Sequence, residues 1–158
     1  MANAKTAAPD AAWQWLDFLS GPDYQRMRIQ LVTPAPRHSH TGNRVTAVRW
    51  ARILRRLGHR VDVRQDWEGE RCDLMLALHA RRSFPSIERF HELRPELPLV
   101  VTLTGTDLYG DLETSAEARQ SLEWADRLVV LQPAGLEQRR RKIVHLHHGG
   151  PPRRVRQH

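Results

Sequence analysis

The sequence predicts an α/β fold in which helices flank a parallel sheet. Short apolar segments alternate along the chain with amphipathic segments of helical length, and this alternation indicates crossover connections between parallel strands. The chain of 158 residues has room for one ordinary domain. Hydrophobic residues make up 40% of it and charged residues 27%, so the composition is that of a globular protein.

The first half of the predicted domain contains three strands and one helix. A short apolar strand is predicted at 29–33. The segment 43–57 is predicted to be an amphipathic helix, because its apolar residues recur every three positions and arginines occupy the other face. Gly58 ends this helix, since glycine most easily adopts the left-handed conformation of a helix cap. Further strands are predicted at 61–63 and 74–78.

The second half continues the alternation. Ser83 begins a helix that Pro95 stops. The segment 99–103 is continuously apolar, which is typical of a strand buried on both faces. Thr114 and Glu117 form a predicted capping box for the next helix. The remaining predicted elements are a strand at 127–131, a short helix from Pro133 and a sixth strand at 142–146. The whole pattern favours a Rossmann-like layered sandwich.

Three regions of the chain differ in composition. Residues 1–26 are expected to form an extension outside the domain, and Met27 is a candidate alternative start because it directly precedes the first strand. Residues 27–146 form the predicted domain. Residues 147–158 consist largely of arginine, glycine and proline, which cannot build a core, so we expect a disordered basic tail.

Charge and composition exclude several classes of protein. Of the net charge of +7, most belongs to the tail, because the first 136 residues hold 18 basic and 17 acidic side chains. Specific nucleic-acid binding is therefore not expected. The single cysteine excludes an internal disulfide. No apolar run can span a bilayer and no secretory signal opens the chain, so a cytoplasmic protein without membrane contact is expected.

Three polar segments follow predicted strands, where ligands bind in open parallel sheets. The first contains Gly42, Asn43 and Arg44 at the start of a helix, where free backbone N–H groups can bind an anion. It has neither the glycine spacing of a dinucleotide fingerprint nor a Walker A sequence. A solvated loop with a helix cap is the alternative interpretation.

The other two segments follow the third and fourth strands. His79, Arg81 and Arg82 stand at the start of a helix, where they suit a phosphate or a sugar hydroxyl. The alternative is a buried histidine beside solvated arginines. Residues 104–111 form a polar shelf in which Asp107 can accept a proton or bind an arginine. The alternative there is a simple turn rich in glycine and hydroxyl groups.

Two further features carry less weight. His145, His147 and His148 resemble a metal-binding tract, but no carboxylate is spaced to join them, so neither a metal nor another cofactor is expected. Cys72 has no histidine close to it in the sequence, and a catalytic thiol is therefore not expected.

Several strings of residues resemble a known family. Leu-His-Ala-Arg-Arg-Ser at 78–83 and Leu-Thr-Gly-Thr-Asp-Leu-Tyr at 103–109 are the most specific, and Met-Arg-Ile-Gln-Leu-Val-Thr-Pro-Ala-Pro at 27–36 adds to them. From Met27 to about residue 136 the chain resembles the amino-terminal half of GT-B glycosyltransferases. More narrowly, it is similar to the selenosugar synthases of selenoneine biosynthesis.

This resemblance implies transfer of a sugar from a UDP-sugar donor, typically UDP-N-acetylglucosamine, to a selenophosphate acceptor. Residues 27–146 would be the acceptor-side domain, and no metal would be needed. The implied catalytic residues are His79 and Asp107. The implied substrate-binding residues are Gly42, Asn43, Arg44, Arg81, Arg82, Thr104, Gly105 and Thr106.

The chain also departs from this family. A GT-B enzyme has two such domains, so a truncated or frame-shifted chain without transferase activity is expected, with self-association through exposed interdomain surface. Two alternatives stay open. One is a GT-B enzyme that makes ordinary O-glycosides, and the other is a non-catalytic binding module whose basic tail binds a polyanion.

Overall fold

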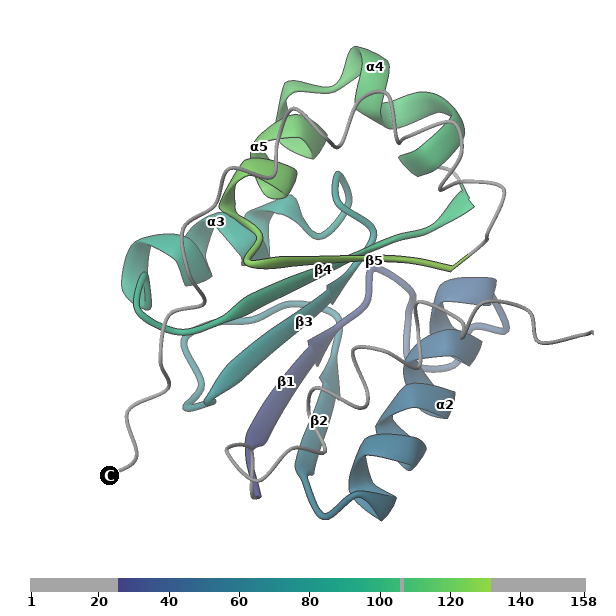
Figure 1. The fold of residues 1–158 in the computed structure, drawn as a ribbon. Helices are drawn as coiled ribbons and strands as arrows, with labels where there is room; N and C mark the ends of the chain where they lie inside the picture. Colours follow the sequence, from purple (N-terminus) through teal and green to yellow (C-terminus); the bar gives the residue numbers. More distant parts are fainter. Residues whose placement is uncertain (1–25, 106, 132–158) are drawn as a thin grey trace, which may run out of the picture.

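The structure, a computed structural model, describes residues 26–105 and 107–131. In this part of the chain five parallel strands form one sheet in the order β2-β1-β3-β4-β5 (Figure 1). The strands are β1 (Arg28–Val32), β2 (Arg60–Arg64), β3 (Leu74–Leu78), β4 (Leu99–Leu103) and β5 (Arg127–Val130). The helices are α2 (Gly42–Arg56), α3 (Phe84–Leu93), the π-helix η2 (Asp107–Asp111), α4 (Leu112–Thr114) and α5 (Ala116–Trp124). The prediction of an α/β fold with a parallel sheet and flanking helices is confirmed.

The predicted strands that fall within these residues lie within one residue of the observed ones. The apolar segments 74–78 and 99–103 match β3 and β4 without any shift. The predicted helix at Pro133 and the predicted strand at 142–146 lie outside the described residues. The extension, apart from its last residue, and the basic tail lie outside them as well, so the predicted domain boundaries stay predictions.

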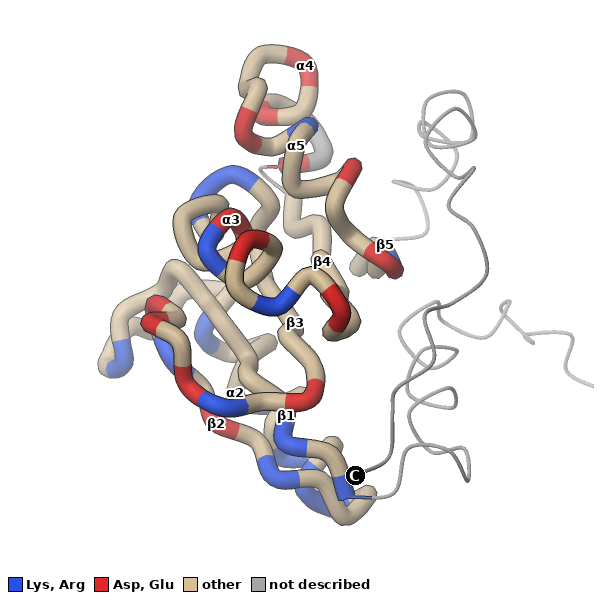
Figure 2. The backbone as a smooth tube through the Cα atoms, turned by 90° about the vertical axis from the view of Figure 1, so that its left-hand side faces the viewer, with Lys and Arg blue, Asp and Glu red and all other residues tan. Residues whose placement is uncertain are grey.

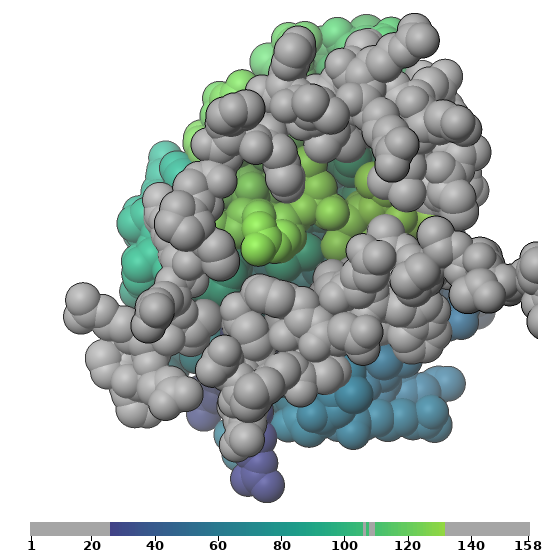
Figure 3. Space-filling view, in the orientation of Figure 1, coloured from purple at the N-terminus to yellow at the C-terminus, as the bar shows by residue number. Residues whose placement is uncertain are grey.

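Helices cover the two faces of the sheet unequally. On one face α2 packs through Ala47, Trp50 and Leu54 against residues of β1 such as Ile29. In the space-filling view of this side, α2 appears in blue below the green and yellow-green residues that lead to β5 (Figure 3). On the other face α3 and α5 pack against β3 and β4, with Phe90 among the buried side chains. The connection from β2 to β3 contains no helix.

The ends of two helices test local predictions. Gly58 has a φ of 97° directly after α2, as the cap prediction requires. The predicted capping box at the start of α5 is wrong, because Ser115 and not Thr114 is the N-cap. The hydroxyl of Ser115 accepts a hydrogen bond from the N–H of Ala118 at 3.2 Å, whereas the hydroxyl of Thr114 donates to the carbonyl of Gly110 at 3.3 Å.

Membrane insertion was not expected from the sequence. Within the described ranges, no helix combines the length and the apolar character that crossing a bilayer requires. The predicted compartment stays a prediction.

Candidate functional site

The site begins at the sharp turn between β3 and α3. His79 directly follows β3, and its φ of 75° is unusual for a residue other than glycine. Its N–H still donates to the carbonyl of Thr102 at 3.0 Å, so the residue continues the sheet ladder while the chain reverses. The hydroxyl of Ser83 donates to the carbonyl of Leu78 at 2.6 Å and closes the turn. Backbone strain of this kind is often found at functional sites.

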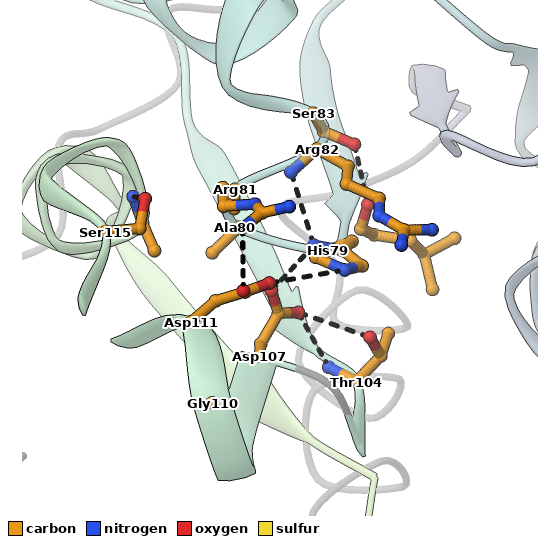
Figure 4. Close-up of polar contacts among 12 residues, drawn as sticks. His79, Ala80, Arg81, Arg82, Ser83, Thr104, Asp107, Gly110, Asp111 and Ser115 are labelled. Carbon is orange, nitrogen blue, oxygen red and sulfur yellow. Dashed lines mark hydrogen bonds and ion pairs between the residues drawn. The ribbon is translucent and has the colours of Figure 1, made fainter. Parts of the chain in front are cut away.

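Asp107 contacts the histidine from η2, the helical turn that follows the neighbouring strand β4. Its Oδ1 lies 2.6 Å from Nδ1 of His79, and both side chains are fully buried (Figure 4). The other carboxylate oxygen accepts hydrogen bonds from the N–H and the hydroxyl of Thr104, at 3.1 and 3.2 Å. Oδ2 of Asp107 is therefore satisfied inside the protein, whereas Oδ1 contacts His79 but has no hydrogen-bond partner among the described residues.

Two groups approach Nδ1 of His79. The backbone N–H of Arg82 donates a hydrogen bond to it at 3.2 Å. The shorter contact, with Oδ1 of Asp107, is an ion-pair contact, and Oδ1 has no hydrogen-bond partner among the described residues. Together these two contacts hold the imidazole ring in place.

Asp111 completes the cluster. Its Oδ2 lies 3.8 Å from Nε2 of His79, and its Oδ1 forms an ion pair with Arg81 at 3.0 Å (Figure 4). The side chain of Arg81 is 44% exposed and that of Asp111 is 17% exposed, so this end of the cluster reaches solvent. The cluster thus runs from Asp107 through the imidazole of His79 and the carboxylate of Asp111 to Arg81.

The structure brings together four of the predicted site residues. His79, Arg81, Thr104 and Asp107 share this cluster. The predicted set did not include Asp111. Its spacing of four residues from Asp107 was the available signal, since that spacing places two side chains on one side of a helical turn.

The other predicted residues contribute less to the cluster. Arg82 approaches it through its backbone N–H, and Gly105 is exposed. Thr106 lies outside the described residues. Gly42, Asn43 and Arg44 form the first turn of α2, and no hydrogen bond or ion pair found among the described residues joins them to His79.

The remaining candidate residues, a cysteine and several histidines, do not belong to this cluster. Burial, followed by the nearby Asp73, raises the pKa of Cys72 to about 12, so near neutral pH this residue is a thiol and a poor nucleophile. His38 and His40 lie in an exposed turn before α2. The predicted tract of three histidines near residue 146 lies outside the described residues.

Comparisons with known proteins give structural neighbours only. No protein-family model matches the chain, and no curated protein matches it. One similar solved structure is a CheY-like response regulator receiver domain protein from Methanospirillum hungatei, with 17% identity and a TM-score of 0.49, covering 77% of this chain and 94% of that one. Another is the response regulator TrrA from Thermotoga maritima, in complex with Mg(2+)-BeF, with 13% identity and a TM-score of 0.44, covering 75% and 97%.

These findings correct the predicted family. The structures found similar are receiver domains, so the assignment to selenosugar synthases and to half of a GT-B fold is wrong. The matching strings are buried strands and the polar turns after them, which parallel α/β folds of different families share. Strand ends of this kind therefore predict a fold and the edge of a sheet more securely than they predict a reaction.

The predictions that depended on this family are corrected with it. The UDP-sugar donor, the selenophosphate acceptor and glycosyl transfer, including transfer to form O-glycosides, have no support. The same holds for a truncated transferase and for self-association through a GT-B interdomain surface. The alternative of a polyanion-binding module depended on the basic tail, which lies outside the described residues. The site residues are unaffected by this correction, because their grouping rests on their geometry.

Proposed function

We propose that this domain binds a ligand carrying a phosphate or carboxylate group at the turn between β3 and α3. One observation carries the proposal: the carboxylate of Asp111 lies between the guanidinium of Arg81 and the imidazole of His79. The two side chains already hold an anion supplied by the protein itself. An anionic ligand would take the place of this carboxylate.

The groups around Asp111 suit such an exchange. Arg81 is the anchor, because its planar guanidinium binds phosphate and carboxylate oxygens in a fixed geometry. The imidazole of His79 offers a second contact through Nε2, and Asp107 contacts the ring from the opposite side, at Nδ1. Arg82 is exposed next to Arg81 and increases the positive potential at the mouth of the site.

Asp111 can be displaced without disturbing the rest of the cluster. It is the last residue of the π-helix η2, whose first residue, Asp107, is buried against His79. Such π-helical turns are rare in proteins and frequent at functional sites. Gly110, directly before Asp111, allows changes of backbone angle. Turning the carboxylate of Asp111 aside would release Arg81 to the ligand while Asp107 stays in place.

The experiment titrates the full chain with inorganic phosphate and follows the backbone amides of Arg82 and Asp111 by NMR. Asp111→Asn removes the internal anion, and we expect phosphate to bind about tenfold more tightly. Arg81→Gln removes the anchor, and we expect binding to weaken about tenfold or more. Arg49→Gln on α2, an exposed arginine away from the cluster, is the matched control and should leave the affinity unchanged.

The opposite signs of the two effects make the test decisive. A structural role of the ion pair would give both variants the same phosphate affinity as the wild type. Equal affinities for Asp111→Asn, Arg81→Gln and the wild type would therefore refute the proposal.

A divalent metal is the second candidate. One ligand atom from each of His79, Asp107 and Asp111 lies within 4.8 Å of the others, and imidazole with carboxylates suits Mn²⁺ or Zn²⁺. The anion is favoured over the metal because Arg81 holds a positive charge 3.0 Å from Asp111 and Oδ2 of Asp107 already accepts two hydrogen bonds from Thr104. The same variant separates the two, since Asp111→Asn would abolish metal binding and strengthen phosphate binding.

A further inference from the structure

A cavity of about 320 Å³ lies at the other end of the sheet, beside the first residues of β1 and β2. Its lining includes Arg28, Gln30, Arg60, Asp62, Arg71 and Cys72. Arg28 and Arg60 begin their strands, whereas His79 follows the last residue of β3. The cavity and the site described above therefore lie at opposite ends of the parallel strands.

The course of the chain explains why no described helix covers this end of the sheet face. In β1 and β2, Ile29 and Val61 belong to the core on the side of α2, so their neighbours in each strand face the opposite side. On that side α3 and α5 cover β3 and β4, but the connection from β2 to β3 contains no helix that could cover β1 and β2. Polar residues occupy the positions that such a helix would bury.

The charges around the cavity are unbalanced. Arg28, Arg60 and Arg71 contribute three guanidinium groups, against one carboxylate from Asp62. Among the described residues, none of these guanidinium groups has a hydrogen bond or ion pair, whereas the nearby Arg64 pairs with Glu70 at 2.8 Å. Basic positions are frequent around β1, β2 and α2, where acidic ones also lie, and acidic positions are frequent around α4 and α5 (Figure 2).

The register of the strands adds to this imbalance. Arg28 and Arg60 are direct neighbours across the parallel pair of β1 and β2. Like charges at facing positions of a sheet destabilise it. Asp73 lies close by, but its Oδ2 accepts a hydrogen bond from the backbone N–H of Arg28 at 2.7 Å. An anion between the two guanidinium groups would relieve the repulsion.

We propose that this cavity is a second binding site, for a small molecule that carries at least two negative charges as phosphate or carboxylate groups. Its volume is at the lower end of the range for small-molecule pockets. Arg28, Arg60 and Arg71 bind the charged groups, and the buried amide of Gln30, whose Nε2 lies 3.4 Å from the carbonyl of Asp62, forms part of the wall. The proposal is independent of the proposed function.

The test titrates the full chain with pyrophosphate and, in a second arm, with citrate. Site-resolved NMR separates the two sites, because the amides of Gln30 and Cys72 report on the cavity and those of Arg82 and Asp111 on the other site. We expect saturable shifts at Gln30 and Cys72. Tighter binding of pyrophosphate identifies a phosphate ligand, and tighter binding of citrate a polycarboxylate.

Variants assign the binding to the cavity. We expect Arg28→Gln and Arg60→Gln each to weaken binding about tenfold, because each removes one charge-assisted hydrogen bond. Asp62→Asn removes the repelling carboxylate and should strengthen binding severalfold. Arg52→Gln, an exposed arginine on α2, is the matched control and should have no effect.

Two results would overturn this proposal. One is the absence of saturable shifts at Gln30 and Cys72 with either anion. The other is an equal loss of affinity in Arg28→Gln and in the Arg52→Gln control, because that would show binding to the general positive charge of this end of the molecule.

Discussion

At the scale of single residues, the buried pair of His79 and Asp107 dominates the site. Burying a carboxylate and an imidazole away from water is costly, and the cost is offset only when their polar atoms find partners. Thr104 supplies two of these partners to Asp107 through its N–H and its hydroxyl. The arrangement is therefore sensitive to the loss of either side chain, since the group that remains would be buried without its partner.

The first stability prediction concerns this pair. Asp107→Ala should lower the free energy of unfolding by about 3–5 kcal/mol, because it leaves His79 buried without its carboxylate. Urea denaturation measures the difference. Asp66→Ala, in an exposed loop, is the control and should change stability by less than about 0.5 kcal/mol. If the two variants lost equal stability, the pair would not be a structural anchor of the site.

Sequence patterns predict where this site lies, but they do not predict the contacts between its residues or its chemistry. His79 and Asp107 stand out because each follows a continuously apolar strand, and strand ends in a parallel sheet share one edge. Their mutual contact could not be predicted, because it depends on the positive φ of His79 and on the π-helical turn of η2. Asp111 was missed for the same reason. The assigned chemistry was wrong because a likeness between strand ends does not specify a substrate.

At the scale of elements, local rules predicted most boundaries and failed at one helix start. Thr114 with Glu117 fits the capping-box pattern, but α4 extends through Thr114. The hydroxyl of Thr114 therefore donates a hydrogen bond within the preceding turn, and Ser115 is the first residue with extended backbone angles. Two adjacent hydroxyl residues give the same pattern in sequence, and only the preceding turn decides between them.

This correction makes a prediction about two neighbouring substitutions. Ser115→Ala should lower the free energy of unfolding by about 1 kcal/mol, because it removes the acceptor for the N–H of Ala118. Thr114→Ala should cost less than about 0.5 kcal/mol, since its hydrogen bond is exposed. Thermal denaturation of the two variants measures the order. The reverse order would restore Thr114 as the N-cap.

At the scale of the whole molecule, the loop 65–73 takes the place of the helix that usually connects two parallel strands. Trp67 is fully buried in it and packs edge-to-face on Phe90 of α3, with ring centres 5.2 Å apart. Its N–H donates to the hydroxyl of Ser86, and its indole N–H donates to the carbonyl of Glu70. A loop of mostly polar residues thus contributes one large side chain to the core of the domain.

Glu70 holds the same loop from the outside. Burial by itself would raise the pKa of this carboxyl, but hydrogen bonds from backbone N–H groups, above all that of Glu68, and the charge of Arg64 outweigh it and lower the pKa. The ionised form is therefore favoured in the folded protein, so its contribution to stability is present near neutral pH and is lost as the pH falls through the lowered pKa. The loop is therefore held by the buried side chain of Trp67 and by the ion pair between Glu70 and Arg64.

The last prediction tests whether the loop is a structural part of the domain. Trp67→Ala should lower the free energy of unfolding by about 3–5 kcal/mol, since it empties a buried indole site and removes the contact with Phe90. Trp67→Phe leaves the carbonyl of Glu70 without its indole donor. It keeps most of the apolar volume, however, so it should lower the free energy of unfolding by less than Trp67→Ala does. Trp124→Ala is the control, because this tryptophan is only partly buried, and urea denaturation compares the three. A loss for Trp67→Ala no greater than that for Trp124→Ala would mean that the sheet face is stable without the loop. The open cavity beside β1 and β2 would then be only one part of a larger uncovered surface.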